Sequence, residues 1–269
     1  MSSTSVSIVL YRTPAEEVRC IVASLRQCEG VGDIWLIDNS EIQTEAFMFL
    51  PATYIFNNRN LGYGAAHNIA LQKSIDKGYR YHLVVNSDIE VTSHTISTLI
   101  NYLDQHNDVA HVMPKVLYPD GSQQHLAKLL PTPYDLLVRR FLPKALNQKR
   151  TAYFELHTLP DNCPTNVPYL SGCFMLLRCQ AIKEIGFFDT RYFMYPEDID
   201  LTRRLHSRYR TIYYPLVNIT HHHRQASYHS LQMLWIHIVN ICRYFNKWGW
   251  IFDTERKKIN KATLLQITK

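Results

Sequence analysis

Apolar runs alternate with amphipathic stretches over the first 120 residues of the chain. Short runs rich in β-branched and aromatic residues are typical of buried strands. Such runs occupy residues 6–11, 33–37, 53–56, 81–85 and 110–117. Between them the spacing of one helix face recurs, at Val18, Ile21, Val22 and Leu25 and again at Ile96, Leu99, Ile100 and Leu103. The alternation predicts an α/β protein with an open, mostly parallel central sheet and helices on both faces.

Turn signals frame two of the predicted helices. Thr13-Pro14-Ala15-Glu16 has the form of a capping box, with Thr at the cap, Pro at the first helical position and Glu at the third. Residues 60–77 begin as a glycine-rich turn, continue as a helix and are ended by Gly78. We therefore expect a helix to follow the first strand and another to follow the third.

The pattern becomes less regular after Pro119-Asp120-Gly121, which marks a turn. Residues 123–168 contain six prolines, so we expect an irregular excursion with a short helix near 134–141. Further elements are predicted at 167–178 (a strand interrupted at Ser171-Gly172), 198–207 (a helix) and 211–214 (a strand). Helical spacing returns near the end of the chain, at Leu231, Leu234, Trp235, Ile238, Ile241, Cys242 and Phe245.

Polar or aromatic side chains stand where three predicted strands end, namely Tyr11, Asp38 and Asp88. In open α/β sheets, ligands bind beyond the carboxyl ends of the strands, so these groups are expected to converge on one crevice. Asp88 closes Asn86-Ser87-Asp88 and offers a carboxylate of the kind that holds Mg²⁺ or Mn²⁺ against a diphosphate. Taken alone, an Asp in this position is also explained by turn chemistry.

Residues 60–68 form a loop of mostly small residues that enters a helix. Such a loop lets the backbone approach a ligand closely, and the helix N-terminus favours anions. The loop lacks both the GxGxxG spacing and the Lys-Ser/Thr of phosphate-binding loops. A plain turn therefore explains it equally well when it is considered alone.

Three acids, Glu197, Asp198 and Asp200, fall within four positions of the segment 193–201. Aromatic residues precede them and apolar residues follow, so loss of solvation is expected to raise a carboxyl pKa toward the range of a general base. Arg203-Arg204 is close enough on a helix to hold one acid, so the three need not share one role. The alternative is a helix N-terminus whose acids face the helix dipole.

Three consecutive histidines, residues 221–223, follow a strand-like stretch. Neighbours on an extended chain point to opposite sides, so His221 and His223 would share one side. One of them is a candidate to complete a metal site or to contact a phosphate, and a solvated polar turn is the alternative.

Composition bounds the class of protein. Hydrophobic residues make up 46% of 269 residues, which is sufficient for a core, and no run of eighteen apolar residues predicts a membrane span. Residues 1–5 lack the basic and apolar regions of a signal peptide. Six cysteines form no CxxC pair and no zinc spacing, so free thiols in a reducing cytoplasm are expected.

The net charge of +6 is unevenly distributed. From residue 201 onward there are 12 Lys and Arg against 2 Asp and Glu, a balance of +10, and the first 200 residues carry 17 against 21, a balance of −4. A basic C-terminal third suggests an anionic partner, such as nucleic acid, a phosphorylated substrate or acidic lipid. A solvated charged surface is the alternative.

These pieces occur in order from Val6 to about Ser227, and together they resemble the family 2 inverting glycosyltransferases, especially the bacterial rhamnosyltransferase-like branch. The pieces are Tyr11; Asp38-Asn39-Ser40; Asn60-x-Gly62 through Asn68; Asn86-Ser87-Asp88; Asp120-Gly121; Ser171-Gly172; Gly186-Phe187-Phe188-Asp189; Phe193-x-Tyr195-x-Glu197-Asp198-x-Asp200-Leu201; and His221 with Ser227 downstream. Each is weak alone, but their shared order and spacing are specific. The resemblance implies a GT-A fold with a Rossmann-like sheet and a C-terminal helical region.

The resemblance also implies roles for individual residues. Contacts to the donor nucleotide fall to Tyr11, Asp38, Asn60, Gly62, Asn68, Asn86, Ser87 and Asp88. Asp88 would bind Mg²⁺ or Mn²⁺, and His221 matches the family's C-terminal metal- or phosphate-binding histidine. Asp198 would deprotonate the acceptor hydroxyl with support from Glu197. Ser171, Gly172 and Tyr195 would lie on the acceptor side.

The sequence departs from the family pattern at three positions. Arg12 stands where Asn usually follows the first-strand Tyr. Asn86 replaces the first Asp of the DXD-like motif, which removes a carboxylate and predicts modest metal affinity. Ser87 stands in place of the proline that is frequent in this branch.

The resemblance implies inverting transfer of a sugar from a nucleoside-diphosphate donor to a polyprenyl-diphosphate-linked glycan, in O-antigen or capsule synthesis. L-Rhamnose from dTDP-rhamnose is the leading donor, and a sugar from a UDP donor is the alternative. The implied location is the cytoplasm, at the inner face of a bacterial membrane. The domains expected are a catalytic domain over 1–227, divided near 118 into donor and acceptor halves, and a basic, aromatic helical extension over 228–269. This extension either contacts anionic lipid, partly through Arg256-Lys257-Lys258, or packs on the catalytic domain.

Three rival interpretations remain. A nucleic-acid-binding protein is suggested by the basic tail, but no helix-turn-helix, zinc or RNA-binding signature accompanies it, so no nucleic acid partner is expected. A nucleotidyltransferase would need a basic glycine-rich loop, which Arg12-Thr13-Pro14 does not supply. A catalytically silent sugar-nucleotide-binding relative is disfavoured because Asp88 and Asp198 are present.

Overall fold

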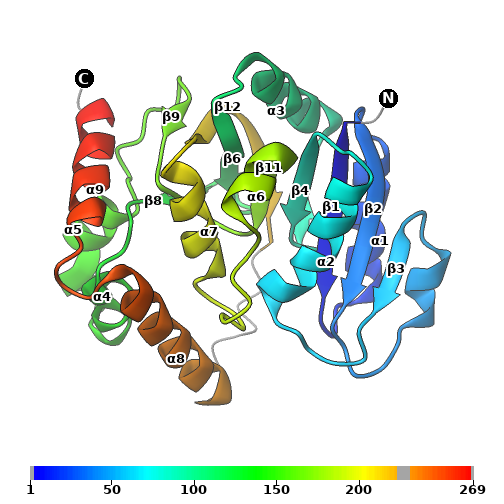
Figure 1. Cartoon of the computed structure of the whole chain (residues 1–269), viewed down its shortest axis with the longest axis horizontal. Helices are drawn as coiled ribbons and strands as arrows, with labels where there is room; N and C mark the ends of the chain where they lie inside the picture. The colour runs from blue at the N-terminus through cyan, green and yellow to red at the C-terminus, as the bar shows by residue number, and fades with distance from the viewer. Residues whose placement is uncertain (1–2, 223–230, 268–269) are drawn as a thin grey trace.

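The computed structural model describes residues 3–222 and 231–267. A mixed, mostly parallel sheet lies at its centre, in the order β3-β2-β1-β4-β11-β6-β12-β5 (Figure 1). These strands are β1 (Thr4–Leu10), β2 (Val31–Asp38), β3 (Thr53–Phe56), β4 (Tyr81–Val85), β5 (Ile89–Glu90), β6 (Val109–Leu117), β11 (Phe174–Arg178) and β12 (Arg210–His221). Four short strands complete the set, namely β7 (Gln123–Gln124) on β6, β9 (Thr165–Asn166) on β12, and the separate pair β8 (Ala127–Lys128) and β10 (Tyr169–Leu170).

Helices cover both faces of the sheet. They are α1 (Ala15–Arg26), α2 (Tyr63–Asp76), α3 (Ser93–Gln105), α4 (Pro133–Leu136), α5 (Lys144–Phe154), α6 (Cys179–Ile185), α7 (Glu197–His206), α8 (Leu231–Trp248) and α9 (Thr254–Ile267), with 3₁₀ turns η1 (Glu45–Phe49) and η2 (Val138–Phe141). Alternation along β4 explains the layering, because Leu83 and Val85 pack with α1 and α3, whereas Val84 packs with α2, α6 and α7. Figure 1 shows α2, α6 and α7 in front of the sheet.

The expected α/β class and mostly parallel sheet are confirmed. β1 pairs in parallel with β2 and β4, and β12 with β6. β11 runs antiparallel to both of its neighbours, β4 and β6, which the alternation of the first 120 residues does not predict. Its sequence lies outside that alternating region, after the irregular excursion.

Three local predictions differ from the structure. The capping box at Thr13 is wrong, because Pro14 is the N-cap, no side chain caps α1, and Thr13 Oγ1 accepts from the Tyr11 amide at 3.1 Å. α5 is absent from the prediction, since its sequence has no apolar stripe and Leu146 is 77% exposed. β12 extends well past the predicted strand at 211–214, because its register shifts after Tyr214 and pairing resumes at Asn218.

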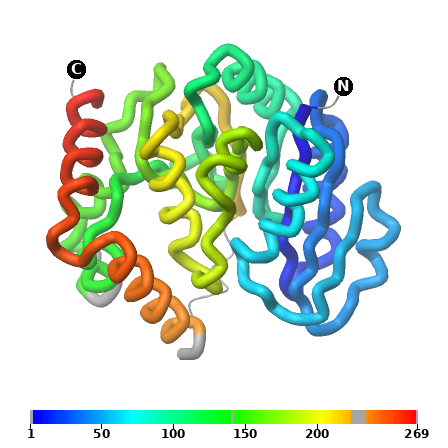
Figure 2. Tube along the Cα trace, in the orientation of Figure 1, coloured from blue at the N-terminus to red at the C-terminus, as the bar shows by residue number. Residues whose placement is uncertain are grey.

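The C-terminal helices pack on the rest of the chain. Ile241, Tyr244 and Phe245 of α8 are buried against Tyr192 and Ile199. Figure 2 shows the N- and C-terminal ends on opposite sides of the molecule. No helix within residues 3–222 or 231–267 combines the length and the apolar character that a membrane span needs.

Two of the basic residues in the C-terminal third are buried and form interactions inside the protein. Arg203 is 2% exposed and makes a two-point ion pair with Asp253, at 2.8 and 2.9 Å. Arg256 is 4% exposed and donates to the carbonyl of Pro131 at 3.2 Å. The expectation that Arg256 forms an exposed lipid-binding cluster with its neighbours is therefore wrong for Arg256, although Lys257 and Lys258 are exposed.

Candidate active site

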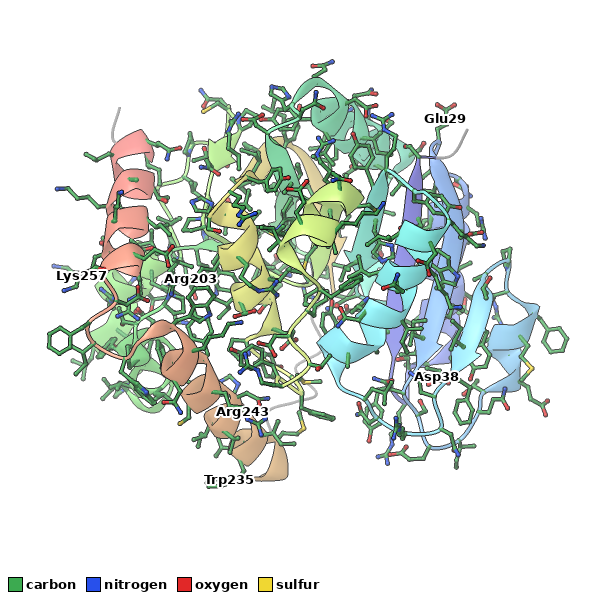
Figure 3. The ribbon with its side chains drawn as sticks, in the orientation of Figure 1. Glu29, Asp38, Arg203, Trp235, Arg243 and Lys257 are labelled. Carbon is green, nitrogen blue, oxygen red and sulfur yellow. The ribbon has the colours of Figure 1, made fainter. Side chains whose placement is uncertain are left out.

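The three acids at the start of α7 have three different surroundings. Asp200 is fully buried and accepts from Arg204 Nε at 2.8 Å and Trp248 Nε1 at 2.8 Å, and Lys247 Nζ lies 2.6 Å from it. Of the two arginines that the sequence offers to hold one of the acids, Arg204 forms the ion pair with Asp200. Arg203 instead turns toward α9 (Figure 3). Asp200 fastens α8 to α7, which leaves Glu197 and Asp198 as the candidates for chemistry.

Asp198 is half-buried and faces a cavity. Its Oδ2 accepts from the Gly172 amide at 2.9 Å, its Oδ1 accepts from the Ile199 amide at 2.8 Å, and the Tyr169 hydroxyl lies 3.5 Å from Oδ2. Burial raises the pKa of Asp198 above the ordinary aspartate range, although the two amide hydrogen bonds oppose this shift. The result is an oriented carboxylate with an increased proton affinity, as a general base requires.

Glu197 is buried beside Asp198. Burial and the charge of Asp198 both raise the pKa of Glu197 above the ordinary glutamate range. Among the described residues, no hydrogen-bond partner lies within reach of its Oε2. We infer that the pair shares its protons unequally, with Glu197 neutral while the cavity-facing Asp198 is ionised.

The small-residue loop packs directly on the segment that precedes these acids. Gly62 has a φ of +85°, and a Cβ there would lie 2.2 Å from the Phe193 carbonyl oxygen, so only glycine fits. The Tyr63 amide donates to that same oxygen at 3.0 Å. Asn60 Oδ1 accepts from the Gly62 amide at 2.9 Å and fixes the turn.

Tyr63 connects the loop to two other motifs. Its hydroxyl lies 2.7 Å from the Gly172 carbonyl oxygen and 3.0 Å from Asn86 Oδ1. Burial and the nearby charges of Glu197, Asp198 and Asp88 raise its pKa well above the ordinary tyrosine value. The sequence pattern does not single out Tyr63 as a site residue, although a tyrosine stands out in a loop of small residues.

Cys173 is a second residue of the site that the sequence pattern does not single out. It is buried, and burial with the charges of Asp88 and Asp198 raises its pKa to about 12. Cys173 and Tyr63 are therefore both under the influence of Asp88 and Asp198, two acids that the chain separates by more than a hundred residues. Ser171, which is half-buried, accepts a hydrogen bond from the Cys173 amide at 3.4 Å.

Asp88 and His221 form a pair at the end of the sheet. Asp88 Oδ1 lies 3.3 Å from His221 Nε2, and β5 and β12 hold the two residues through antiparallel pairing of Ile89 with His221. No third His, Cys, Asp or Glu joins them into a metal-binding group within the residues that the structure describes. His223 and Ser227 lie outside the described residues.

Gln124 on β7 orients the imidazole of His221. Its Nε2 donates to the His221 carbonyl at 2.8 Å, which leaves Oε1 to accept from His221 Nδ1 at 2.9 Å. In the neutral ring, Nε2 then turns a lone pair toward the carboxylate of Asp88. A divalent cation stabilises such a facing pair, so the residues present fit Mg²⁺ or Mn²⁺, with substrate phosphate and water completing the ligands.

The remaining donor-side candidates differ in exposure. Tyr11 is 43% exposed, and its hydroxyl donates to Glu41 at 3.0 Å. Asp38 is fully buried near the lower end of β2 (Figure 3), where it accepts from the Ser40 amide at 2.9 Å and the Tyr54 hydroxyl at 2.6 Å. A ribose contact through this carboxylate would require one of those bonds to open.

Asn68 and Ser87 have intramolecular partners outside the loop. Asn68 donates to the Phe188 carbonyl at 2.9 Å and accepts from the Phe188 amide at 3.0 Å, so it fastens α2 to the segment before α7. Ser87 donates to Glu17 on α1. In this conformation both residues support the site's framework.

A cavity of about 910 Å³ opens beside Asp198. Tyr169, Tyr195 and Pro196 line it near the acid, while α4, α5 and α8 enclose the rest. Tyr195 is 40% exposed, and its ring packs edge-on against His237 of α8 with centroids 5.0 Å apart. The volume lies within the range of ordinary ligand pockets.

Comparison with known proteins gives one family. A model of the family described as "Glycosyl transferase family 2" matches residues 5–186. An N-acetylglucosaminyl-diphospho-decaprenol L-rhamnosyltransferase of Mycobacterium tuberculosis is 31% identical over 178 residues, which are 61% of this chain and 56% of that protein. The chain thus spans little more than half the length of this relative.

Two further proteins are similar. Rhamnosyltransferase WbbL of Escherichia coli is 28% identical over 194 residues, 68% of this chain and 69% of that protein. The solved structure of the mannosyltransferase PcManGT from Pyrobaculum calidifontis, in complex with GDP-Man and Mn²⁺, superposes with a TM-score of 0.58 at 13% identity, covering 99% of this chain and 75% of the other. At that identity the likeness shows the fold alone.

Proposed function

The chain belongs to glycosyl transferase family 2 and has a GT-A fold, and from this premise we propose that it is an inverting glycosyltransferase. The observation that carries the proposal is the convergence of two acids from distant parts of the chain. Asp88, paired with His221, and Asp198, facing the cavity, both raise the pKa values of the buried Tyr63 and Cys173.

The proposed reaction is a single in-line displacement. Asp198 takes the proton of an acceptor hydroxyl as its oxygen attacks the anomeric carbon, and the bond from that carbon to the nucleoside diphosphate breaks with inversion. Glu197, held neutral, keeps a second charge away from the base. A Mg²⁺ or Mn²⁺ ion held by Asp88 and His221 would supply positive charge to the departing diphosphate.

The identities of the donor and of the acceptor are more specific proposals. The names of two relatives support L-rhamnose as the transferred sugar. We propose dTDP-rhamnose as its donor, with a sugar from a UDP donor as the alternative. The name of the Mycobacterium tuberculosis relative supports a polyprenyl-diphosphate-linked acceptor, and surface polysaccharide synthesis follows from that chemistry. We also propose that residues up to about 118 bind the donor and the following residues, to about 227, bind the acceptor; that second boundary lies outside the described residues.

Calorimetric titration tests the proposed function. We expect one of dTDP, UDP and GDP to bind the full chain tightly in the presence of Mn²⁺ or Mg²⁺ and weakly in EDTA, because the ion joins the diphosphate to Asp88 and His221. Preferential binding of dTDP supports the rhamnosyl donor, and preference for UDP supports the alternative. Absence of metal-dependent binding by all three nucleotides contradicts the proposal.

We propose that the protein works at the inner face of the membrane, where a polyprenyl acceptor would lie. Support comes from exposed apolar side chains on the C-terminal helices and their connection, since Trp235 is 66% exposed and Phe252 is 91% exposed. Figure 3 shows Trp235 on the outer side of α8. Lys257 and Lys258, also exposed, supply the charge that anionic lipid attracts.

Replacing Trp235 and Phe252 together by serine is expected to reduce cosedimentation with anionic vesicles by about tenfold, since each inserted aromatic contributes buried apolar area. Phe49 on η1, 85% exposed at the other end of the sheet, provides the control Phe49→Ser, which should leave cosedimentation unchanged. Equal sedimentation of the double variant and the parent protein would contradict the membrane contact.

A further inference from the structure

The cavity beside Asp198 has a charged wall that proton abstraction does not use. Lys128, Arg139 and His157 line the cavity and converge on Glu155. Lys128 Nζ lies 3.1 Å and Arg139 Nη1 lies 2.9 Å from Glu155 Oε1, while His157 Nε2 lies 3.5 Å from Oε2. We call these four residues the Glu155 cluster.

The Glu155 cluster carries an excess of positive charge. Two permanent cations share one carboxylate, so the cluster itself has a net charge of about +1 even when His157 is neutral. Lys128, Arg139 and Glu155 are 15%, 23% and 18% exposed, so solvent screens that charge only in part.

Asp135, which also lines the cavity, does not offset this excess. Asp135 accepts from Arg150 through both oxygens, at 2.8 and 2.7 Å, so that pair is neutral by itself. The capping hydroxyl of Thr132 also donates to Asp135 at 2.6 Å, which further occupies the carboxylate. Among the described residues that line the cavity, Asp198 is the remaining acid, and the charge of Lys128 acts on it.

We propose that the Glu155 cluster binds the diphosphate of the acceptor while the acceptor's terminal sugar reaches Asp198. This inference rests on the proposed function, and it adds the site at which the acceptor's phosphates are recognised. Arginine and lysine donate charge-assisted hydrogen bonds to phosphate oxygens, and two cations with an imidazole match the charge of a diphosphate better than that of a neutral glycan.

The rest of the cavity fits the two ends of such an acceptor. Toward Asp198, the aromatic rings of Tyr169 and Tyr195 provide surfaces on which a sugar packs. Leu142, which lines the cavity and is 39% exposed, provides an apolar edge. This apolar edge suits the first carbons of a lipid chain leaving toward the solvent or a membrane.

A metal-free binding experiment isolates this site from the donor site. Citronellyl diphosphate, a short isoprenyl diphosphate, is titrated calorimetrically into the full chain in EDTA, a condition under which metal-dependent donor binding is absent. Citronellyl monophosphate and inorganic phosphate are titrated in parallel. We expect the diphosphate to bind and the two monophosphates to bind at least about tenfold more weakly, because each loses charge-assisted hydrogen bonds.

Variants that should change the affinity for citronellyl diphosphate in opposite directions distinguish a binding role of the Glu155 cluster from a structural one. Arg139→Gln should weaken citronellyl diphosphate binding by about tenfold or more, and Lys128→Gln should act in the same direction. Glu155→Gln should tighten binding, because it removes the carboxylate that competes for both cations. Arg19→Gln, which changes net charge at an exposed residue of α1, is the control and should have no effect.

The outcomes distinguish this inference from the proposed function. Equal binding of citronellyl diphosphate by the parent chain, Arg139→Gln and Lys128→Gln, with all three folded by thermal melting, overturns the Glu155 cluster as a diphosphate site. Equal binding of the monophosphate overturns it in favour of a single phosphate, such as a lipid headgroup. If the diphosphate binds as expected but no nucleotide binds with Mn²⁺ or Mg²⁺, the proposed function fails while the anion site stands.

Discussion

Asp198→Asn is expected to lower the turnover number by about 10²- to 10⁴-fold, the usual contribution of a general base. An amide cannot take the acceptor proton, although it preserves the size of the carboxylate and can still accept one hydrogen bond from Gly172 or Ile199. Nucleotide affinity should change little, because the donor-side pair of Asp88 and His221 is untouched. Product formation measured by mass spectrometry, with calorimetry of nucleotide binding, checks both expectations; normal transfer by this variant would exclude Asp198 as the base.

The neighbouring acids provide controls for this prediction. Glu197→Gln imitates a neutral Glu197, so transfer should persist. Asp200→Asn should act on stability, because it weakens the ion pairs to Arg204 and Lys247, and a loss of about 3 kcal/mol in the free energy of unfolding is expected. If Glu197→Gln instead abolishes turnover and Asp198→Asn does not, the two acids have exchanged roles.

The pH dependence of transfer follows from the same pair. Burial raises the pKa of Asp198, and only the ionised form accepts a proton. Accordingly, kcat/KM should fall as the pH drops through this raised pKa and stay level above it as far as these acids are concerned. In Glu197→Gln a neutral amide replaces a neutral carboxyl group, so the acidic limb should stay where it is in the parent chain.

The parts of the site that depend on local spacing could be predicted from the sequence. Arg204 stands four residues after Asp200, and a helix brings such a pair together whatever surrounds it. Tyr11, Asp38 and Asp88 follow strands, and a parallel sheet gathers strand ends at one edge. The small residues of the loop suggested a close approach of the backbone to a ligand or a plain turn, and the close approach found at Gly62 is to the Phe193 carbonyl oxygen.

Contacts between distant segments could not be predicted in this way. Gln124 meets His221 across 97 positions, and Tyr63 meets Gly172 across 109. The Glu155 cluster is built by β8, η2 and the end of α5, all within the excursion whose prolines obscure any periodic pattern. Asn68 is the opposite case, a residue that the sequence assigns to ligand binding. Its side chain forms two hydrogen bonds with the backbone of Phe188, a contact that local spacing does not reveal.

Removal of Asp88 is expected to abolish metal-dependent nucleotide binding. Asp88→Ala deletes the carboxylate of the Asp88–His221 pair, and imidazole alone is a poor ligand for Mg²⁺ and Mn²⁺, which prefer oxygen. Electron paramagnetic resonance of free Mn²⁺, with the preferred nucleotide present, measures the effect without an activity assay. The parent chain should bind Mn²⁺ more tightly than Mg²⁺, because the borderline imidazole of His221 suits the softer ion better.

Gln124→Leu is expected to lower Mn²⁺ affinity in part, where Asp88→Ala abolishes metal-dependent binding. Without Oε1, His221 Nδ1 has lost the acceptor that fixes its tautomer, so the ring is free to turn Nε2 away from Asp88 and Mn²⁺ affinity should fall by about 10- to 100-fold. Gln124→Glu keeps an acceptor for Nδ1 and should retain most of the affinity. The matched control is Gln123→Leu, which removes only a hydrogen bond to the Tyr213 hydroxyl at 3.1 Å and should leave Mn²⁺ binding unchanged. Parent-like affinity in Gln124→Leu would show that β7 does not orient the histidine and that the pair holds the ion unaided.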